Sequence, residues 1–207
     1  MEKNLIAMVS EAQASYQSQI VAAKINGEIR DIQTPYTDTD TIDFIELDSS
    51  VGWSIYRRSV LFLLITAVDQ LEKNAEVTAK FTVNKGLYCE IKRPNRAVDI
   101  HFIQEVESKM REMIAANLPI IKRSIPRQEA IELFRKQGRV GKVNLISALQ
   151  QPIISIYTCE DYVDYLYGPM LPETKELGRF ELDYEPDGVL IRTPDEMTNE
   201  RVRKRAN

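Results

Sequence analysis

The chain has 207 residues, enough for one or two domains with a hydrophobic core. Its net charge is −4 and its pI is near 5.3, so the chain as a whole lacks the basic surplus typical of a strong RNA-binding domain. One histidine and two cysteines exclude most metal sites, most histidine-based catalysis and a disulfide framework. No secretory signal is readable, and the longest apolar run, Val60 to Ile65, is too short to cross a bilayer, so we expect a cytoplasmic protein without membrane contact.

The first fifty residues predict one helix and three strands. The dipeptide Asn26-Gly27 is a strong two-residue hairpin signal between two of these strands. The expected elements are a helix over Leu5–Tyr16 and strands over Val21–Ile25, Glu28–Arg30 and Ile42–Leu47. The segment Asp48–Gly52 then breaks the pattern and indicates a domain boundary.

The middle of the chain predicts a long helix, a hairpin and a second amphipathic helix. Between Trp53 and Lys73 apolar residues recur at three- and four-residue spacing, which is typical of a helix with one buried face. The expected elements are helices over Trp53–Lys73 and Phe102–Asn117, strands over Val77–Val83 and Leu87–Lys92, a strand over Pro119–Ile125, and a helix over Arg127–Gln137 that Pro126 opens and Gly138 closes.

The last third is rich in strands. After a short helix over Lys142–Leu149, the expected strands are Ile153–Thr158, Tyr162–Tyr165, Gly178–Tyr184 and Val189–Arg192. Beyond Thr193-Pro194 the sequence turns polar and ends in RVRKRAN, which is typical of a linker. Helices and strands alternate irregularly with hairpins, so the predicted fold class is α+β.

Several segments, in this order, resemble threonyl-tRNA synthetase. AAKINGEIRDI and IDFIELDSS are similar to the second half of a TGS domain, the small ubiquitin-like module that opens these enzymes. GWSIYRRSVLFLLITAVDQL, KGLYCEI and FIQEVESKMREMIAANLPIIKRSIPRQEAIELF resemble the adjoining editing domain, the second additional domain of threonyl- and alanyl-tRNA synthetases, and IYTCEDYVDYLYGPMLPET resembles its closing motif. The resemblance covers nearly everything from Val21 to Arg192.

This resemblance implies two modules and a linker. Residues 1–50 would form a partial TGS-like β-grasp module that lacks its first hairpin. Residues 51–193 would form an editing-like α+β sandwich with an antiparallel sheet and a long helix, and residues 194–207 a polar linker toward a further domain.

The chain departs from the family where the family carries out hydrolysis. The family signature is a pair of histidines four apart on a helix, with a cysteine and a histidine four apart near the end, residues that could hold a metal or orient water against an ester. These positions hold Arg58 and Phe62 on the helix, and Leu166 and Met170 near the end. None of these side chains supplies a neutral imidazole or a thiolate, so the resemblance implies a degenerate pocket without catalytic residues.

A second resemblance concerns the parent protein. The combination of YRRS, KGLYCEI and CEDYVDYLYGPM is similar to the N-terminal region of bacterial uridine kinase-like proteins, in which these modules precede a P-loop kinase domain. The 207 residues contain no GxxxxGK[ST] phosphate loop. The resemblance therefore implies a kinase domain beyond Asn207 as the partner of this chain. ATP and Mg²⁺ would bind there, and this chain would hold no cofactor and no metal.

Arg58 is the pocket residue best suited to ligand binding, because a guanidinium offers a rigid fork of donors to phosphate or carboxylate. The alternative is a solvated helix face or an ion pair. Arg57 and Arg58 differ by about 100° around a helix, so the sequence leaves open which of them faces inward. Further candidates for the pocket rim are Asp161, Asp164 and Tyr167, with Tyr88 and Tyr157 near it, although tyrosines in strands more often serve packing.

The other reactive side chains have structural interpretations. Cys159 precedes two acids, which raise the pKa of a thiol, and no histidine partner stands nearby, so a buried structural thiol is expected. Cys89 lies in an apolar strand, and His101 stands at a helix entrance as a cap or surface residue. Basic residues at Lys92, Arg93, Arg96 and in the C-terminal RVRKRAN could touch RNA, but the acidic total disfavours it.

We therefore expect a non-catalytic accessory region, regulatory or ligand-sensing, of a uridine or nucleoside kinase-like protein. Its remodelled pocket, around Arg58, Phe62, Leu166 and Met170, would bind a small ligand or act as a scaffold. Two alternatives are kept: a free-standing deacylase that hydrolyses mischarged tRNA, and a module that binds structured RNA.

Overall fold

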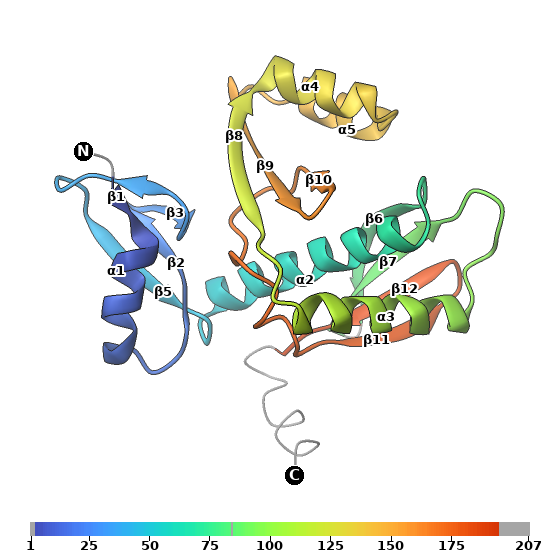
Figure 1. The fold of residues 1–207 in the computed structure, drawn as a ribbon, viewed down its shortest axis with the longest axis horizontal. Helices are drawn as coiled ribbons and strands as arrows, with labels where there is room; N and C mark the ends of the chain where they lie inside the picture. The colour runs from blue at the N-terminus through green and yellow to red at the C-terminus, as the bar shows by residue number, and fades with distance from the viewer. Residues whose placement is uncertain (1–2, 84, 195–207) are drawn as a thin grey trace, which may run out of the picture.

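A computed structural model describes residues 3–83 and 85–194 and confirms the α+β class (Figure 1). The predicted linker lies outside the described residues except for Pro194. The helices are α1 (Leu5–Ala12), α2 (Ser50–Leu71), α3 (Ile100–Ala115), α4 (Arg127–Lys136) and α5 (Val140–Ser147). The strands are β1 (Lys3–Asn4), β2 (Ile20–Ile25), β3 (Glu28–Asp31), β4 (Pro35–Tyr36), β5 (Ile42–Glu46), β6 (Glu76–Val83), β7 (Gly86–Lys92), β8 (Ile121–Pro126), β9 (Ile153–Cys159), β10 (Tyr162–Asp164), β11 (Glu181–Glu185) and β12 (Gly188–Arg192).

Residues 3–47 form a small module, here called the N-terminal module, around its own core. A three-stranded antiparallel sheet in the order β3-β2-β5 packs against α1 through a cluster that contains Leu5, Val9 and Ile20. Asn26 and Gly27 have φ angles of 51° and 86°, the left-handed geometry that a two-residue hairpin requires, so the predicted hairpin is confirmed. The predicted helix ends at Ala12 and continues as a 3₁₀ turn.

Helix α2 begins earlier than its apolar pattern predicted. The side chain of Ser49 accepts a hydrogen bond from the backbone of Gly52 at 3.0 Å and caps the helix, which starts at Ser50. A Cβ atom on Gly52 would stand 2.2 Å from the carbonyl oxygen of Glu46, so only glycine lets β5 pass so close to this first turn. The segment predicted to break the pattern thus belongs partly to the helix.

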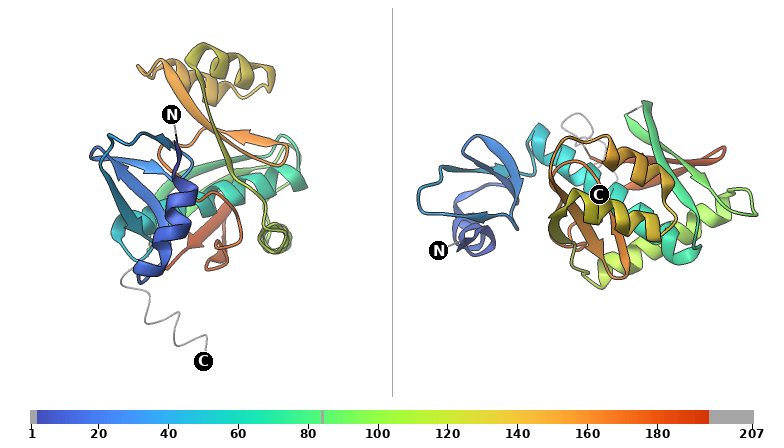
Figure 2. Two further views of the ribbon diagram at one scale, coloured as in Figure 1. Left: turned by 60° about the vertical axis from the view of Figure 1, so that its left-hand side comes forward. Right: turned by 90° about the horizontal axis from the view of Figure 1, so that it is seen from above.

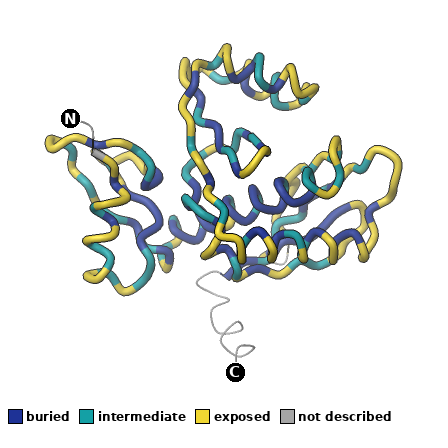
Figure 3. The backbone as a smooth tube through the Cα atoms, in the orientation of Figure 1, coloured by how far each residue is buried: buried dark blue, intermediate teal, exposed yellow. Residues whose placement is uncertain are grey.

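Helix α2 is the central core element of the molecule, visible as the dark, buried helix in Figure 3. It lies with α3 on one face of a four-stranded antiparallel sheet in the order β11-β12-β7-β6 (Figures 1 and 2). By length and composition it is the one helix among the described residues that could cross a membrane. However, 67% of its apolar window is buried inside this molecule, as in a core helix.

A second three-stranded antiparallel sheet, β10-β9-β8, carries the helical hairpin α4–α5 at its far end (Figure 1). The two helices pack onto it through Ile131, Phe134, Ile146 and Ile154. Helix α5 begins at Val140, two residues before its predicted start, and β11 begins at Glu181, three residues after its predicted start. These shifts lie within the usual uncertainty of element boundaries.

Candidate functional site

A cleft of about 910 Å³ opens where three parts of the chain meet. The hairpin β2–β3 of the N-terminal module forms one wall, and the first turns of α2 form the second. Strands β8 and β9 form the third wall together with residues 165–169, here called the 165–169 loop. Small-molecule sites usually span roughly 300–1,000 Å³, so this cleft is large enough for an organic ligand. The polar side chains that line it belong to Glu28, Arg30, Asp31, Ser50, Ser54, Arg58, Lys122, Gln151, Ser155, Tyr157, Tyr165 and Tyr167.

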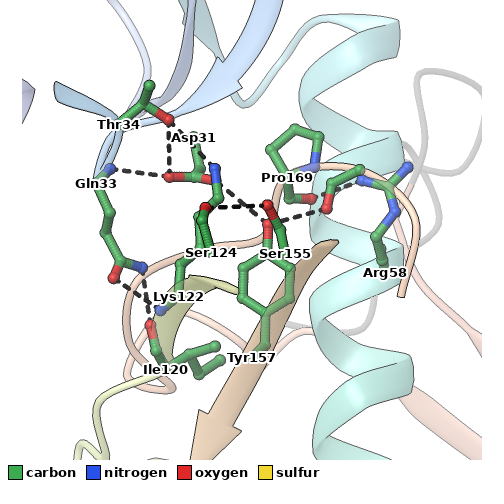
Figure 4. Close-up of polar contacts among 11 residues, drawn as sticks. Asp31, Gln33, Thr34, Arg58, Ile120, Lys122, Ser124, Ser155, Tyr157 and Pro169 are labelled. Atoms are coloured by element: carbon green, nitrogen blue, oxygen red, sulfur yellow. Dashed lines mark hydrogen bonds and ion pairs between the residues drawn. The ribbon is translucent and has the colours of Figure 1, made fainter. Parts of the chain in front are cut away.

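Arg58 faces this cleft, whereas Arg57 is exposed to solvent. The Nη1 atom of Arg58 donates a hydrogen bond of 2.6 Å to the carbonyl oxygen of Pro169, so the side chain reaches from α2 to the 165–169 loop (Figure 4). The orientation that the sequence left open is therefore settled by a single contact between distant segments.

Gly168 holds the guanidinium of Arg58 from one side. Its φ angle is 102°, which favours glycine, and a Cβ atom there would lie 2.8 Å from Cζ of Arg58, so a larger residue would push the guanidinium aside. Burial lowers the pKa of Arg58 below its ordinary value; Tyr157 and Tyr167 oppose this shift, and Arg57 adds to it. The guanidinium stays protonated at neutral pH, because its ordinary pKa lies above about 12.

Arg58 is also the uncompensated charge of the cleft. Arg30 forms an ion pair with Glu28, and Nζ of Lys122 lies 2.7 Å from the carboxylate of Asp31. Among the described residues, no carboxylate lies within ion-pair distance of Arg58. The charged side chains that line the cleft therefore leave one positive charge without a partner.

Asp31 anchors a polar network that joins the two modules (Figure 4). Its carboxylate is 1% exposed, and it accepts hydrogen bonds from the backbone of Gln33 at 3.1 Å and from the hydroxyl of Thr34 at 3.3 Å. The hydroxyl of Tyr157 lies 3.2 Å from this carboxylate and 3.0 Å from the carbonyl oxygen of Gly168. Tyr157 thus connects the N-terminal module to the loop that holds Arg58.

Two of the four positions predicted to surround the pocket lie elsewhere. Phe62 is fully buried in the main core, with its ring centroid 6.0 Å from that of Tyr162, and Met170 is fully buried in the same core. Leu166 is partly buried and does line the cleft. The predicted pocket is therefore corrected: Arg58 and Leu166 face the cleft, whereas Phe62 and Met170 fill the interior because both are large and apolar.

The two predicted rim carboxylates do not line the cleft either. Asp161 is exposed in the turn between β9 and β10. Asp164 is 1% exposed and lies 2.8 Å from Arg139 and 2.8 Å from Lys142, with the hydroxyl of Tyr162 at 2.9 Å. This carboxylate fixes the α4–α5 hairpin to β10 and has a structural role.

Among the other rim candidates, Tyr157 and Tyr167 line the cleft, but Tyr88 does not. Tyr88 stacks on Phe81 in the four-stranded sheet, with a centroid distance of 5.2 Å. Sequence reasoning missed Asp31, Lys122 and Gly168. The first two carry no local signal, because a charged residue in a short strand looks the same whether it is solvated or paired across the fold.

Among the described residues, no cysteine and no histidine lines the cleft. Burial raises the pKa of Cys89 to about 12, and burial together with Glu160 raises that of Cys159 to about 11, so both thiols are protonated at neutral pH. His101 is exposed in the first turn of α3, whose cap is Asp99. The described residues contain no group of three or more His, Cys, Asp and Glu side chains that could hold a metal ion.

The chain matches no protein-family model. It is similar to a segment of threonine–tRNA ligases. It is 35% identical over 165 residues to the ligase of Syntrophotalea carbinolica, a match that covers 79% of this chain and 26% of that protein. It is 31% identical over 163 residues to the ligase of Acidithiobacillus ferrooxidans, and this match covers 78% of this chain and 25% of that protein. Over 161 residues it is 30% identical to the ligase of Aquifex aeolicus, with coverage of 76% and 25%.

The chain thus spans about a quarter of the length of the curated relatives it matches. These similarities agree with the resemblance to threonyl-tRNA synthetase that the motifs indicated. They lend no support to a uridine kinase-like parent, which stays a prediction from the motifs.

Proposed function

We propose that this chain is a non-hydrolytic ligand-binding region of the threonyl-tRNA synthetase editing type, and that it acts as an accessory part of a larger protein. The proposal rests on the side chains that occupy the four signature positions and on where they lie. Phe62 and Met170 are core residues, Leu166 is aliphatic, and Arg58 bonds to the carbonyl oxygen of Pro169. The cleft remains open beside them at about 910 Å³.

Ester hydrolysis needs a group that accepts a proton from water, or a nucleophile. At the four signature positions, a protonated guanidinium and three apolar side chains accept no proton. Cys159, the thiol within the closing motif, is buried and protonated at neutral pH. The two carboxylates that line the cleft, Glu28 and Asp31, are each paired with a cation of the protein. These features favour binding over hydrolysis.

The rival function is a deacylase that hydrolyses mischarged tRNA. The similarity to threonine–tRNA ligases favours it, and bound water together with substrate hydroxyls can replace protein groups in such a reaction. The test incubates the 207-residue chain with seryl-tRNA. We expect ester loss at the rate of the protein-free reaction. Faster hydrolysis that disappears in an Arg58→Ala variant would establish the deacylase instead.

The third reading, a module for structured RNA, is tested by retention of tRNA at increasing salt. Phosphate contacts make RNA affinity fall steeply with salt, so a steep loss of retention would support this reading. No retention at low salt would dismiss it. The net charge of −4 leads us to expect no retention.

The larger protein is proposed from the motifs to carry a C-terminal P-loop kinase domain, in the cytoplasm and without membrane contact. The mass of the native product in cell extract tests this. A product well above 23.8 kDa that yields a phosphate-loop peptide would support the kinase parent. A larger product with the catalytic peptides of a tRNA ligase would replace it with a ligase parent.

A further inference from the structure

We propose that the cleft binds a small organic anion, and that Arg58 forms the ion pair with its phosphate or carboxylate group. The inference rests on the proposed function, because a cleft without hydrolytic residues keeps its ligand intact. It names the chemical class of that ligand and the residue that selects it.

The charge balance of the cleft favours an anionic ligand. Within the cleft, Glu28 forms an ion pair with Arg30, and Asp31 forms one with Lys122. Arg58 alone carries a charge that no described carboxylate neutralises. A half-buried cation without a counter-ion is costly, and an anionic ligand would remove that cost.

The guanidinium of Arg58 is held in a position that suits an anion. One of its nitrogens is bonded to the carbonyl oxygen of Pro169, and Gly168 lies against its plane, so the group is fixed before a ligand arrives. Its other N–H groups have no protein acceptor among the described residues. A guanidinium held in this way presents a planar fork that suits two oxygens of one phosphate or carboxylate.

The other side chains that line the cleft suit the organic part of such a ligand. The hydroxyls of Ser54 and Ser155 border the same space and can form hydrogen bonds with polar groups of a ligand. Tyr167 lines it too and is 79% exposed, which leaves its ring free for contact with a flat organic group. Because the volume of about 910 Å³ far exceeds that of one inorganic ion, the ligand carries an organic part beside its anionic group.

The experiment titrates the 207-residue chain with orthophosphate and, separately, with acetate, at constant ionic strength, and follows binding by NMR. The decisive variant is Arg58→Gln, whose side chain stays polar but is shorter and carries no charge. Arg57→Gln is the matched control, since it removes the same charge one residue away, on the exposed side of α2. We expect saturable binding to the wild type and to Arg57→Gln, and a loss of about tenfold or more in Arg58→Gln.

The wild-type protein gives a second, variant-free readout. Phosphate or acetate should shift the backbone resonances of Gly168 and Tyr167 first, because these residues adjoin the guanidinium. Binding of orthophosphate alone would identify a phosphorylated ligand, and binding of acetate alone a carboxylated one. If both anions bind, the ligand is assigned as an organic anion with either a phosphate or a carboxylate group.

The inference is overturned if neither anion saturates the wild type, if Arg57→Gln weakens binding as much as Arg58→Gln, or if the shifted resonances lie away from the cleft. Seryl-tRNA hydrolysis is measured on the same wild-type preparation. Hydrolysis would reject the proposed function, whatever the titration gives. Absence of both hydrolysis and anion binding would reject this inference alone.

Discussion

The ammonium group of Lys122 lies 2.7 Å from the carboxylate of Asp31, across the junction between strand β8 and the N-terminal module (Figure 4). Nearby, the side chain of Gln33 donates to the carbonyl oxygen of Ile120 at 2.8 Å and accepts from the backbone of Lys122 at 3.1 Å. These contacts make the N-terminal module part of the cleft wall. They join the two modules at the cleft, beside the apolar packing of Val21, Ile45 and Leu47 in the main core.

Replacement of the buried carboxylate should loosen this junction. In Asp31→Asn the charge of Lys122, whose side chain is 16% exposed, loses its counter-ion, and we expect the free energy of unfolding to fall by roughly 3 kcal/mol. Urea denaturation measures this loss. Asp161→Asn serves as the control, since that carboxylate is exposed and should change stability by less than about 0.5 kcal/mol. Equal effects of the two variants would contradict a buried anchor at Asp31.

Tyr157 should matter for ligand binding as well as for stability. In Tyr157→Phe the carboxylate of Asp31 and the carbonyl oxygen of Gly168 both lose the hydroxyl that lies between them, which costs about 1–2 kcal/mol of stability. We also expect weaker anion binding, because the 165–169 loop that holds Arg58 becomes less ordered.

Tyr162→Phe is the matched control for that variant. It also removes a hydroxyl that bonds a buried aspartate, Asp164, but at a site outside the cleft. Its stability should fall by a similar amount while anion affinity stays unchanged. If both variants weaken binding equally, the link from Tyr157 to the 165–169 loop has no functional meaning.

Gly168→Ala should displace the guanidinium. The φ angle of 102° is unfavourable for alanine, and the new methyl group would meet Cζ of Arg58 at 2.8 Å. We expect a stability loss of about 1–3 kcal/mol and a clear loss of anion binding. Gly141→Ala is the control, because a Cβ atom there meets nothing within 4 Å. Normal binding by Gly168→Ala would show that the close contact with Arg58 is unimportant.

Asp164 should act on the helical hairpin and leave the cleft unchanged. In Asp164→Asn, Arg139 and Lys142 lose their shared counter-ion, so α5 should detach more often from β10. Hydrogen exchange of residues 139–147 should become at least about tenfold faster, while anion affinity stays as in the wild type. A loss of anion binding in this variant would show that Asp164 contributes to the cleft after all.

Alkaline pH should destabilise the fold through the two buried thiols. In the folded protein their pKa values, about 12 for Cys89 and about 11 for Cys159, are raised above the ordinary value. The contribution of the neutral thiols to the stability of the fold is therefore fully present below about pH 8.5. It is lost as the pH rises through the folded pKa values. The free energy of unfolding should therefore decline from about pH 9 upward, and less steeply in a Cys89→Ala, Cys159→Ala double variant. An identical decline in both proteins would assign the effect to other groups.

The sequence by itself determined the secondary structure of most of the chain and one feature of the cleft. The five α-helices among the described residues were all predicted, the two long ones from apolar spacing. Asn26-Gly27 predicted a hairpin that the φ angles confirm, because such signals depend on neighbours within a few residues. Of the four signature positions, Arg58 and Leu166 line the cleft, and their role in ligand binding stays a prediction.

Only the tertiary structure decided what those residues do. Arg58 rather than Arg57 faces the cleft, where it donates to the carbonyl oxygen of Pro169. Phe62 and Met170 are fully buried in the main core, which distant segments of the chain build together. The pairing of Asp31 with Lys122 is invisible in the chain, since a short strand with a charged residue has the same local pattern whether or not a counter-ion lies across the fold. Burial and long-range charge pairing depend on how distant segments meet, and local propensity carries no information about that.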